Sequence, residues 1–397
     1  MTAKVRLGDI VTVVTKGTTP TTIGFQFEDS GINFVKIESI SEDGTFLKEK
    51  FSHISDECNV QMRRSQLQEN DILFSIAGAI GRSAIVTKEI LPANTNQALA
   101  IIRVPKGKID YNYLLYALSS SAINQQATQH QQGVAQLNIS LKNVSDFLLP
   151  IYTEAMQKRI VHNLKKIDKL ISLRKQQLAK LDELVKARFV EMFGNPVSNT
   201  MGWKSEQLVD CLQGIDNGKS FVCFNDTRQG QEPAMLKLSA VTYGVYNQKE
   251  NKVLLDDTMF IKAAEVHRGD LLFTRKNTPE LVGRCAYVTN TEPNLMMPDL
   301  IFRLNPNDKI NAIFLWKLIN HELFREKIQN IATGSAKSMS NISKERLGKL
   351  KIIIPPIPLQ NQFAAFVERI DQQKQTVQQS LEKLELMKKA LMQEYFG

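Results

Sequence analysis

The sequence predicts an α+β chain made of two tandem copies of one α/β globule, each followed by a long helix. Residues 157–194 hold no Gly or Pro before the last position, and their apolar residues recur at spacings of four and three. Adding 203 to these positions finds the same stripe in residues 360–397. The segments before the two stripes resemble each other at offsets of 199 to 203. These observations together indicate an internal duplication of the whole chain.

The spacing of the stripes is typical of a helix that packs along another long helix. A helix over 157–194 would be roughly 55 Å long, which is more than a single globular core needs. The expected seam residues are Ile160, Leu164, Ile167, Ile171, Leu178, Leu181 and Val185 in the first helix and Phe363, Val367, Ile370, Val377, Leu381, Leu384 and Leu391 in the second.

Four basic residues interrupt the seams at positions where the other copy is apolar: Arg174, Arg188, Lys374 and Lys388. Two interpretations stay open at this point. Their charged ends can reach solvent from an imperfect seam, or the two helices are complementary to each other rather than to themselves.

Each globule is expected to combine short buried strands with a helix. The matching strands are 34–37 with 235–238, 70–75 with 269–274, 84–86 with 286–288, 100–104 with 301–304 and 148–150 with 353–355, and the matching helices are 113–118 with 313–318. The expected order is a first globule (1–156), a first helix (157–194), a linker (195–203), a second globule (204–359) and a second helix (360–397).

The composition, with 43% hydrophobic and 23% charged residues, is that of a soluble globular protein. No apolar run reaches membrane-spanning length, and residues 1–10 lack the apolar core of a signal peptide, so we expect a cytoplasmic protein with no membrane partner. The four cysteines and five histidines show no metal-binding spacing, so no metal site is expected.

The net charge of +9 is unevenly distributed. Residues 157–194 hold ten basic and four acidic residues, a net charge of +6, whereas residues 1–156 hold 14 basic and 15 acidic residues, a net charge of −1. A basic excess suits a polyanionic partner such as nucleic acid. A DNA-binding face on the first globule would have to be a local patch.

Four further features recur in both copies. A polar loop that contains Gly leads to Asn-Ile-Ser at 138–140 and 341–343, a short apolar strand runs into Pro, a Gln stands at 157 and 360, and Phe-Gly ends each helix. With the order globule, helix, globule, helix, these features resemble the specificity subunit of Type I restriction-modification enzymes over the whole chain.

That resemblance implies two target recognition domains, each reading one half of a bipartite site in double-stranded DNA. It implies that the helices pack as an antiparallel coiled coil, which spaces the domains and binds two modification (methyltransferase) subunits, and that restriction (translocase-nuclease) subunits join the complex. The chain itself would bind no cofactor, with S-adenosylmethionine, ATP and Mg²⁺ on the partner subunits. Two domains related by a pseudo-two-fold axis match the local symmetry of a duplex, with contacts roughly 34 Å apart. Because the domain sequences differ, the target would be asymmetric.

Polar and basic side chains on loops beside strands are the candidates for contacts to bases and phosphates. In the first globule they are Lys36, Arg82, Asn94, Asn96, Gln97, Gln131, Gln132, Gln136 and Asn138. In the second they are Lys219, Lys237, Arg275, Lys276, Asn277, Arg284, Ser335, Lys337, Ser338 and Asn341. Each could instead be an ordinary solvated loop residue, and Asn138 and Asn341 could be caps of a short helix or turn.

No catalytic motif is recognised in the sequence. Residues 214–220 have three residues between the glycines where a P-loop needs four, and Pro298-Asp299 lacks the remainder of a nuclease pattern. We therefore expect a non-catalytic subunit. The alternatives are the specificity polypeptide of a methylation-only or related fused system, a nuclease with an unrecognised site, and a coiled-coil interaction protein without DNA specificity.

Overall fold

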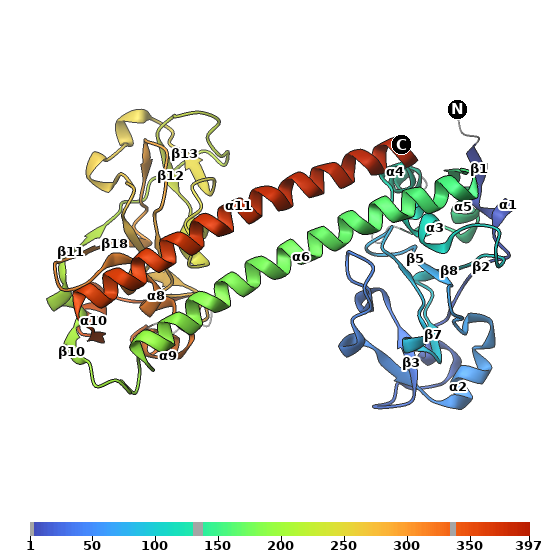
Figure 1. The fold of residues 1–397 in the computed structure, drawn as a ribbon, viewed down its shortest axis with the longest axis horizontal. Coiled ribbons are helices and arrows are strands. Elements are labelled where there is room, and N and C mark those ends of the chain that lie inside the picture. Colours follow the sequence, from blue (N-terminus) through green and yellow to red (C-terminus); the bar gives the residue numbers. More distant parts are fainter. Residues whose placement is uncertain (1–3, 130–137, 334–338) are drawn as a thin grey trace. The chain divides into compact units, whose positions relative to one another are not determined.

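The computed structural model describes residues 4–129, 138–333 and 339–397 and divides the chain into two compact units (Figure 1). Unit 1 comprises residues 1–175 and 379–397, and unit 2 comprises residues 176–378. Each unit therefore contains one globule, part of the helix that follows the first globule and part of the helix that ends the chain. The division crosses both long helices rather than following the predicted boundaries at 156 and 359.

Unit 1 is built from a four-stranded sheet, a three-stranded sheet, a two-stranded pair and short helices. In chain order its globule holds β1 (Lys4–Arg6), α1 (Leu7–Ile10), β2 (Val13–Lys16), β3 (Ile32–Val35), β4 (Ser52–Ile54), α2 (Asp56–Gln61), β5 (Ile72–Ser75), β6 (Ser83–Ile85), β7 (Ala93–Thr95), β8 (Leu99–Arg103), α3 (Tyr111–Leu118), α4 (Ser121–Gln129), α5 (Leu141–Ser145) and β9 (Leu148–Pro150). The sheet orders are β2-β8-β5-β6, β4-β3-β7 and β1-β9.

Unit 2 repeats this arrangement. In chain order its globule holds β10 (Lys204–Gln207), β11 (Leu212–Asn217), β12 (Ala234–Leu236), α7 (Ser239–Thr242), β13 (Asn251–Val253), β14 (Leu271–Thr274), β15 (Lys276–Asn277), β16 (Cys285–Tyr287), β17 (Leu295–Met296), β18 (Ile301–Pro306), α8 (Ala312–Asn320), α9 (Glu322–Asn330), β19 (Ser340–Asn341), α10 (Lys344–Gly348) and β20 (Lys351–Ile354). The orders β11-β18-β14-β16, β13-β12-β17 and β10-β20 are those of unit 1, strand for strand.

The parallel pairing in the three-stranded sheets is part of the duplication. β3 pairs antiparallel with β4 and parallel with β7, and β12 does the same with β13 and β17. The predicted strands at 34–37 and 235–238 begin earlier and end sooner than expected, since Ile37 starts a 3-10 turn and Leu238 precedes α7.

The two long helices are α6 (Glu154–Phe193) and α11 (Ile357–Phe396), drawn in Figure 1 as uninterrupted ribbons. Both begin three residues before the predicted start. Pro358 lies in the first turn of α11, a place that proline fits because its missing N–H has no helical partner there. Gly194, with a φ of 71°, ends α6 in the left-handed conformation.

Within each unit the two helix segments run antiparallel. In unit 1, Asp168 of α6 forms an ion pair with Lys388 of α11, and Arg174 of α6 donates a hydrogen bond to Ser380 of α11. Residue numbers along α11 therefore fall as those along α6 rise. In unit 2, Asp182 pairs with Lys374 in the same sense. All fourteen predicted seam residues are buried or half-buried.

The core of each globule continues into these helices. In unit 1 the core combines Leu7, Phe74 and Tyr113 of the globule with Ile160 of α6 and Phe396 of α11. In unit 2 it joins globule residues to the end of α6 and the start of α11 through Phe193 and Phe363. A globule is therefore completed by the start of the helix that follows it and by the end of the other helix.

Candidate nucleic-acid interface

One end of the four-stranded sheet gathers predicted residues in unit 1. Gln97 accepts a hydrogen bond from the Thr19 hydroxyl at 2.7 Å, and Asn96 accepts one from the backbone N–H of Ala98. Asn138 forms a β-bridge with Ala77 beyond the end of β5. Asn96, Gln97 and Asn138 come from two segments about forty residues apart in sequence, and the fold places both beside the β5 end.

The corresponding end in unit 2 holds the basic candidates. The Arg275 guanidinium donates to Asn341 Oδ1 at 3.3 Å and lies over the Phe302 ring at 5.0 Å. Lys276 lies 3.9 Å from the carboxylate of Asp299. β15 and β19, which carry Lys276 and Asn341, pair antiparallel. Lys219 is exposed on the neighbouring loop, with its ammonium 5.1 Å from the Phe221 ring.

Two glycines show why these loops have the same geometry in both copies. A Cβ on Gly17 would lie 1.7 Å from the carbonyl oxygen of Thr95, and one on Gly218 would lie 2.2 Å from that of Pro298. Only glycine allows two backbones to approach so closely. In unit 1 the glycine lets the loop after β2 cross closely over the segment before β8. In unit 2 it does the same for the loop after β11 and the segment before β18.

Two predicted contacts are contradicted by burial. Asn94 is 0% exposed and its amide donates to Asn59 Oδ1 and to the Met62 carbonyl. Asn277 is buried and its amide donates to the Thr242 hydroxyl at 3.0 Å. Both amides satisfy hydrogen bonds inside the globules, so the sequence analysis was wrong to place them at the surface.

Two other candidates have partners that the sequence did not indicate, and a third is half-buried. The Arg82 guanidinium donates to the carbonyls of Ile40 and Ile37 at 2.8 and 3.4 Å and so holds a loop of its own globule. Lys36 lies over the Phe27 ring at 4.3 Å. Lys237 is half-buried beyond the end of β12. Candidates that lie outside the described residues are Gln131, Gln132, Gln136, Ser335, Lys337 and Ser338.

The Asn-Ile-Ser motif has a structural role in both copies. Ile139 and Ile342 are buried in the two cores. The hydroxyl of Ser140 accepts from Asn143 N–H, and that of Ser343 accepts from Arg346 N–H, so each serine caps the short helix that follows. The caps were expected at Asn138 and Asn341, but Ser140 and Ser343, two residues further along the chain, form them.

The seam charges contact the opposite helix. Lys388 pairs with Asp168 at 2.6 Å and Lys374 with Asp182 at 2.5 Å. The Arg174 Nε donates to the Ser380 hydroxyl at 3.2 Å. These cross-helix contacts favour the interpretation that α6 and α11 are complementary to each other. Arg188 forms its ion pair with Glu191 of its own helix, while its guanidinium lies over the ring of Phe366 on α11.

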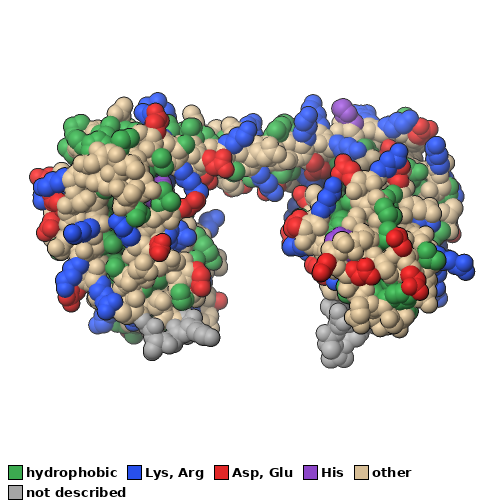
Figure 2. Space-filling view, turned by 90° about the horizontal axis from the view of Figure 1, so that it is seen from below, with side chains coloured by type: hydrophobic (Ala, Val, Ile, Leu, Met, Phe, Trp, Pro, Cys, Tyr) green, Lys and Arg blue, Asp and Glu red, His purple; other side chains and the backbone are tan. Residues whose placement is uncertain are grey.

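Charges of both signs are mixed on the face seen in Figure 2, where Lys and Arg side chains lie over both globules and along the helices with Asp and Glu among them. The helix α6 carries most of the basic excess, as its sequence predicts. Among residues 4–129, 138–333 and 339–397, the structure contains no helix long and apolar enough to cross a membrane. No group of three or more His, Cys, Asp and Glu in the same ranges could hold a metal ion.

A set of half-buried polar residues that attach each globule to the helices was not predicted from the sequence. In unit 1 the Tyr116 hydroxyl donates to Asp168 at 2.6 Å, and burial together with this bond raises the pKa of Tyr116. The residues at the corresponding positions in unit 2 are Lys317 and Asp371; burial lowers the pKa of Lys317 to about 8 and raises that of Asp371. The repeated Ile-Asp pair at 167–168 and 370–371 was the available signal.

The chain matches the family described as Type I restriction modification DNA specificity domain twice, over residues 2–183 and 202–386. The chain belongs to this family. The two matches cover most of the sequence and coincide with the two structural copies. The chain therefore carries two tandem domains of this family.

Relatives and solved structures agree with the family. The chain is 29% identical over 175 residues to the Type I restriction enzyme EcoEI specificity subunit and 29% identical over 198 residues to the EcoBI specificity subunit, both of Escherichia coli. These matches cover 44% and 48% of this chain but only 30% and 40% of the relatives. Neither the methylation-only or fused alternative nor the nuclease alternative is favoured by them.

Two solved structures share the fold over almost all of the chain. One, from work on complex assembly and conformational transition of the type I R-M system, has a TM-score of 0.59 at 17% identity and covers 99% of this chain and 97% of its own. The other is the Type-I restriction-modification system S subunit from M. genitalium, with a TM-score of 0.55 at 14% identity, covering 100% and 96%.

Proposed function

We propose that this chain is the non-catalytic DNA-reading subunit of a Type I restriction-modification complex. The observation that carries the proposal is the presence of two copies of the specificity domain, with identical strand order, on one pair of long helices. Each globule would read one half of an asymmetric, interrupted DNA target. The ends of the four-stranded sheets that carry Asn96, Gln97 and Asn138 in unit 1 and Arg275, Lys276 and Asn341 in unit 2 are the proposed contact regions.

The proposed partners follow from this role. The helix pair would space the two globules and bind two modification subunits, with restriction subunits completing the complex. S-adenosylmethionine, ATP and Mg²⁺ would be held by the partner subunits, and this chain would bind none of them. Cytoplasmic location is part of the same proposal, because the target is intracellular DNA.

The test is to express the chain with the modification subunits of its own system and to map methylated bases by single-molecule sequencing. We expect one bipartite motif with two different halves. Methylation without sequence preference would contradict a reading role. Cleavage or methylation by the purified chain alone would contradict the non-catalytic role.

Two matched domain exchanges then separate the readers. Replacing residues 13–103, from β2 to β8, with the equivalent segment of another family member leaves the helix contacts of Gln157, Tyr113 and Tyr116 unchanged. Replacing residues 212–306 does the same in unit 2. Each exchange should change one half of the motif only. A change in both halves after either exchange would refute independent readers.

A further inference from the structure

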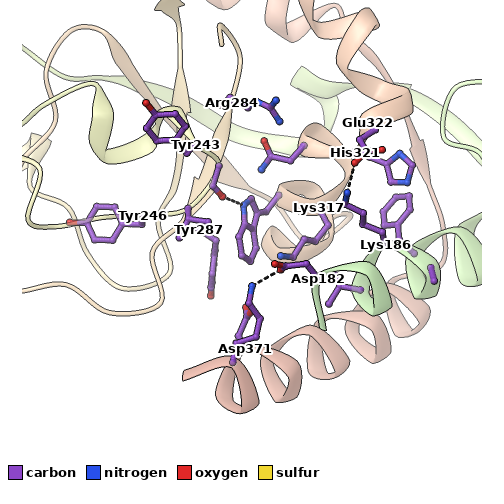
Figure 3. Close-up of a pocket in the computed structure, with 18 of the residues that line it drawn as sticks. Asp182, Lys186, Tyr243, Tyr246, Arg284, Tyr287, Lys317, His321, Glu322 and Asp371 are labelled. Carbon is purple, nitrogen blue, oxygen red and sulfur yellow. Dashed lines mark hydrogen bonds and ion pairs between the residues drawn. The ribbon is translucent and has the colours of Figure 1, made fainter. Parts of the chain in front are cut away.

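Unit 2 contains a large cavity that the DNA-reading role does not use. Its volume is about 1120 Å³, and it is lined by α6, α8 and the loop before β13, with Asp371, Lys374 and Gln375 of α11 at its edge (Figure 3). Small-molecule sites are usually concave and lined largely by apolar and aromatic side chains, and the aromatic wall of this cavity fits that form.

Aromatic side chains form one side of the cavity. Trp316 is stacked on Tyr287 at a ring-centre distance of 6.0 Å, and its indole N–H donates to the Gly244 carbonyl at 2.9 Å. This bond holds the turn of residues 243–245 at the edge of the cavity. Tyr243, on that turn, is 75% exposed although it borders an apolar hollow. A flat apolar molecule in the cavity would find both Tyr243 and Tyr287 on its walls (Figure 3).

Most charges around the cavity are already paired. Lys186 pairs with Glu322 and Lys374 with Asp182, while Lys317 and Asp371 face each other's charge inside the unit. These pairs leave no net charge, so they would neither attract nor repel a charged ligand strongly.

One arginine that lines the cavity, Arg284, forms no ion pair with a carboxylate in the described parts of the chain. Within the described parts of the chain, the Arg284 guanidinium at the cavity edge has no hydrogen-bond or ion-pair partner. Arg325, which does not line the cavity, is buried and donates to the carbonyls of Gly283, Val282 and Glu280. Burial and the nearby charge of Arg284 lower the pKa of Arg325 to about 10. A guanidinium without a hydrogen-bonded partner at the edge of the cavity, with a second positive charge close to it, favours an anion.

We propose that this cavity binds a small aromatic molecule with one negative charge. Its rings would lie against Tyr243 and Tyr287, and its anionic group would pair with Arg284, whose planar donors suit a carboxylate, sulfonate or phosphate. The inference does not depend on the proposed DNA-reading function. Because α6, α8 and the globule loop all line the cavity, a bound ligand would stabilise the attachment of this globule to its helices.

The test uses the full chain and two probes with the same rings, 8-anilinonaphthalene-1-sulfonate and the uncharged N-phenyl-1-naphthylamine. Calorimetric titration should find one site that binds the sulfonate at least tenfold more tightly, together with a rise in the melting temperature of the chain. Equal affinity for the two probes would refute the anion-binding role.

Three variants assign the site. Arg284→Gln should remove the preference for the sulfonate and leave the binding of the neutral probe unchanged. Ala187→Trp, at an exposed α6 position on the cavity wall, should block both probes without removing a buried group. Arg346→Gln, at an exposed position on α10, is the matched control and should change neither affinity. Sulfonate binding that survives both cavity variants would overturn the proposal.

A final arm separates this site from the DNA surface, since Arg284 is also a candidate for DNA contact. A short DNA duplex should leave the bound sulfonate in place. Displacement of the sulfonate by duplex would assign Arg284 to the DNA surface and refute a separate ligand site, whatever the outcome for the DNA-reading function.

Discussion

The two units hold their helices by equivalent contacts. In unit 1, buried Gln157 accepts from the N–H of Asp110 and donates to the Tyr152 carbonyl. In unit 2, Gln360 accepts from the N–H of Asn311 and donates to the carbonyls of Lys309 and Pro355. Each glutamine thus joins the first turns of a long helix to the residue that caps α3 or α8. A buried amide with every bond satisfied tolerates little change, which explains why both copies keep it.

The units differ in the side chains at the ends of their sheets, which make no contacts that hold the long helices. The exposed and half-buried candidate side chains at the sheet ends are amides in unit 1 and largely cations in unit 2, on the same strand order. The comparison teaches that the attachment of globule to helix is duplicated, whereas the outward surface is free to diverge. The following substitutions test how equal the two attachments are.

The largest difference is expected at the helix ends. Phe193 contacts three aromatic rings, with centres 4.8 Å away at Phe314, 5.1 Å at Phe189 and 5.3 Å at Phe363. Phe396 has its main ring contact at Tyr113, 5.4 Å away. Phe193→Ala should lower the free energy of unfolding of unit 2 by about 4–5 kcal/mol, and Phe396→Ala that of unit 1 by about 3 kcal/mol.

Both tryptophans, Trp203 and Trp316, lie in unit 2, so their fluorescence reports that unit while circular dichroism reports the whole chain. In urea titrations, Phe193→Ala should shift the fluorescence transition and Phe396→Ala should leave it in place. Equal shifts of the fluorescence transition would mean that the two attachments do not act separately.

A smaller difference in stability is expected at the ion pairs that Arg103 forms in unit 1 and Arg303 forms in unit 2. The Arg103 guanidinium binds the buried Asp71 carboxylate through two bonds of 2.7 Å, and this bond raises the pKa of Arg103. Arg303 lies 3.3 Å from Asp270 but also pairs with Asp216 at 2.9 Å. Asp71→Asn should therefore cost about 3 kcal/mol, because it leaves a partly buried charge without its partner.

Asp270→Asn is the matched substitution and should cost only about 1 kcal/mol, since Asp216 keeps its contact with Arg303. Chemical unfolding monitored by circular dichroism for the whole chain and by tryptophan fluorescence for unit 2 measures both losses. If Asp270→Asn proved the more costly change, the ranking of the two pairs would be wrong.

The third difference concerns pH. The folded-state pKa of Lys317, about 8, lies below the ordinary value of 10.5 because of burial, so the unfolded chain binds the proton more tightly. Stability therefore rises with pH between about 8 and 10.5 as the folded state releases this proton first. Charges that face Lys317 are Asp371, Asp182 and Lys374.

Lys317→Met removes this dependence. Between pH 7 and 9.5 the parent should gain about 1–2 kcal/mol on the variant in the fluorescence-detected transition of unit 2. The corresponding change in unit 1, Tyr116→Phe, should give no such slope over this range, because burial and Asp168 keep the tyrosine neutral. Parallel pH profiles for parent and Lys317→Met would show that the lysine titrates normally.

The duplication and the helices could be predicted because they rest on local and periodic signals. The stripe at Ile160, Leu164 and Ile167, repeated 203 residues later, depends only on helical geometry. The same reasoning could not show that the end of α11 completes the first globule, because the contact of Phe396 with Tyr113 joins residues far apart in sequence.

The candidate site was less predictable for a related reason. Asn94 and Gln97 stand three residues apart in one polar run, yet the first is buried and the second exposed. Their difference depends on Asn59 and Met62, which α2 and the turn after it bring against the strand. The cavity of unit 2 was missed because its aromatic and charged residues come from segments that carry no common motif.

The end of each long helix completes the core of the globule that this helix does not follow. This has a consequence for the order in which the chain folds during synthesis. Residues 176–378 are contiguous, so unit 2 can assemble once they have left the ribosome. Unit 1 must wait for residues 379–396, made after all of unit 2, to cover Tyr113 and complete its core. Closing an intervening segment of about two hundred residues costs entropy that grows only slowly with length, and the prior folding of unit 2 shortens the effective loop. The first globule to be synthesised is thus the last to be finished.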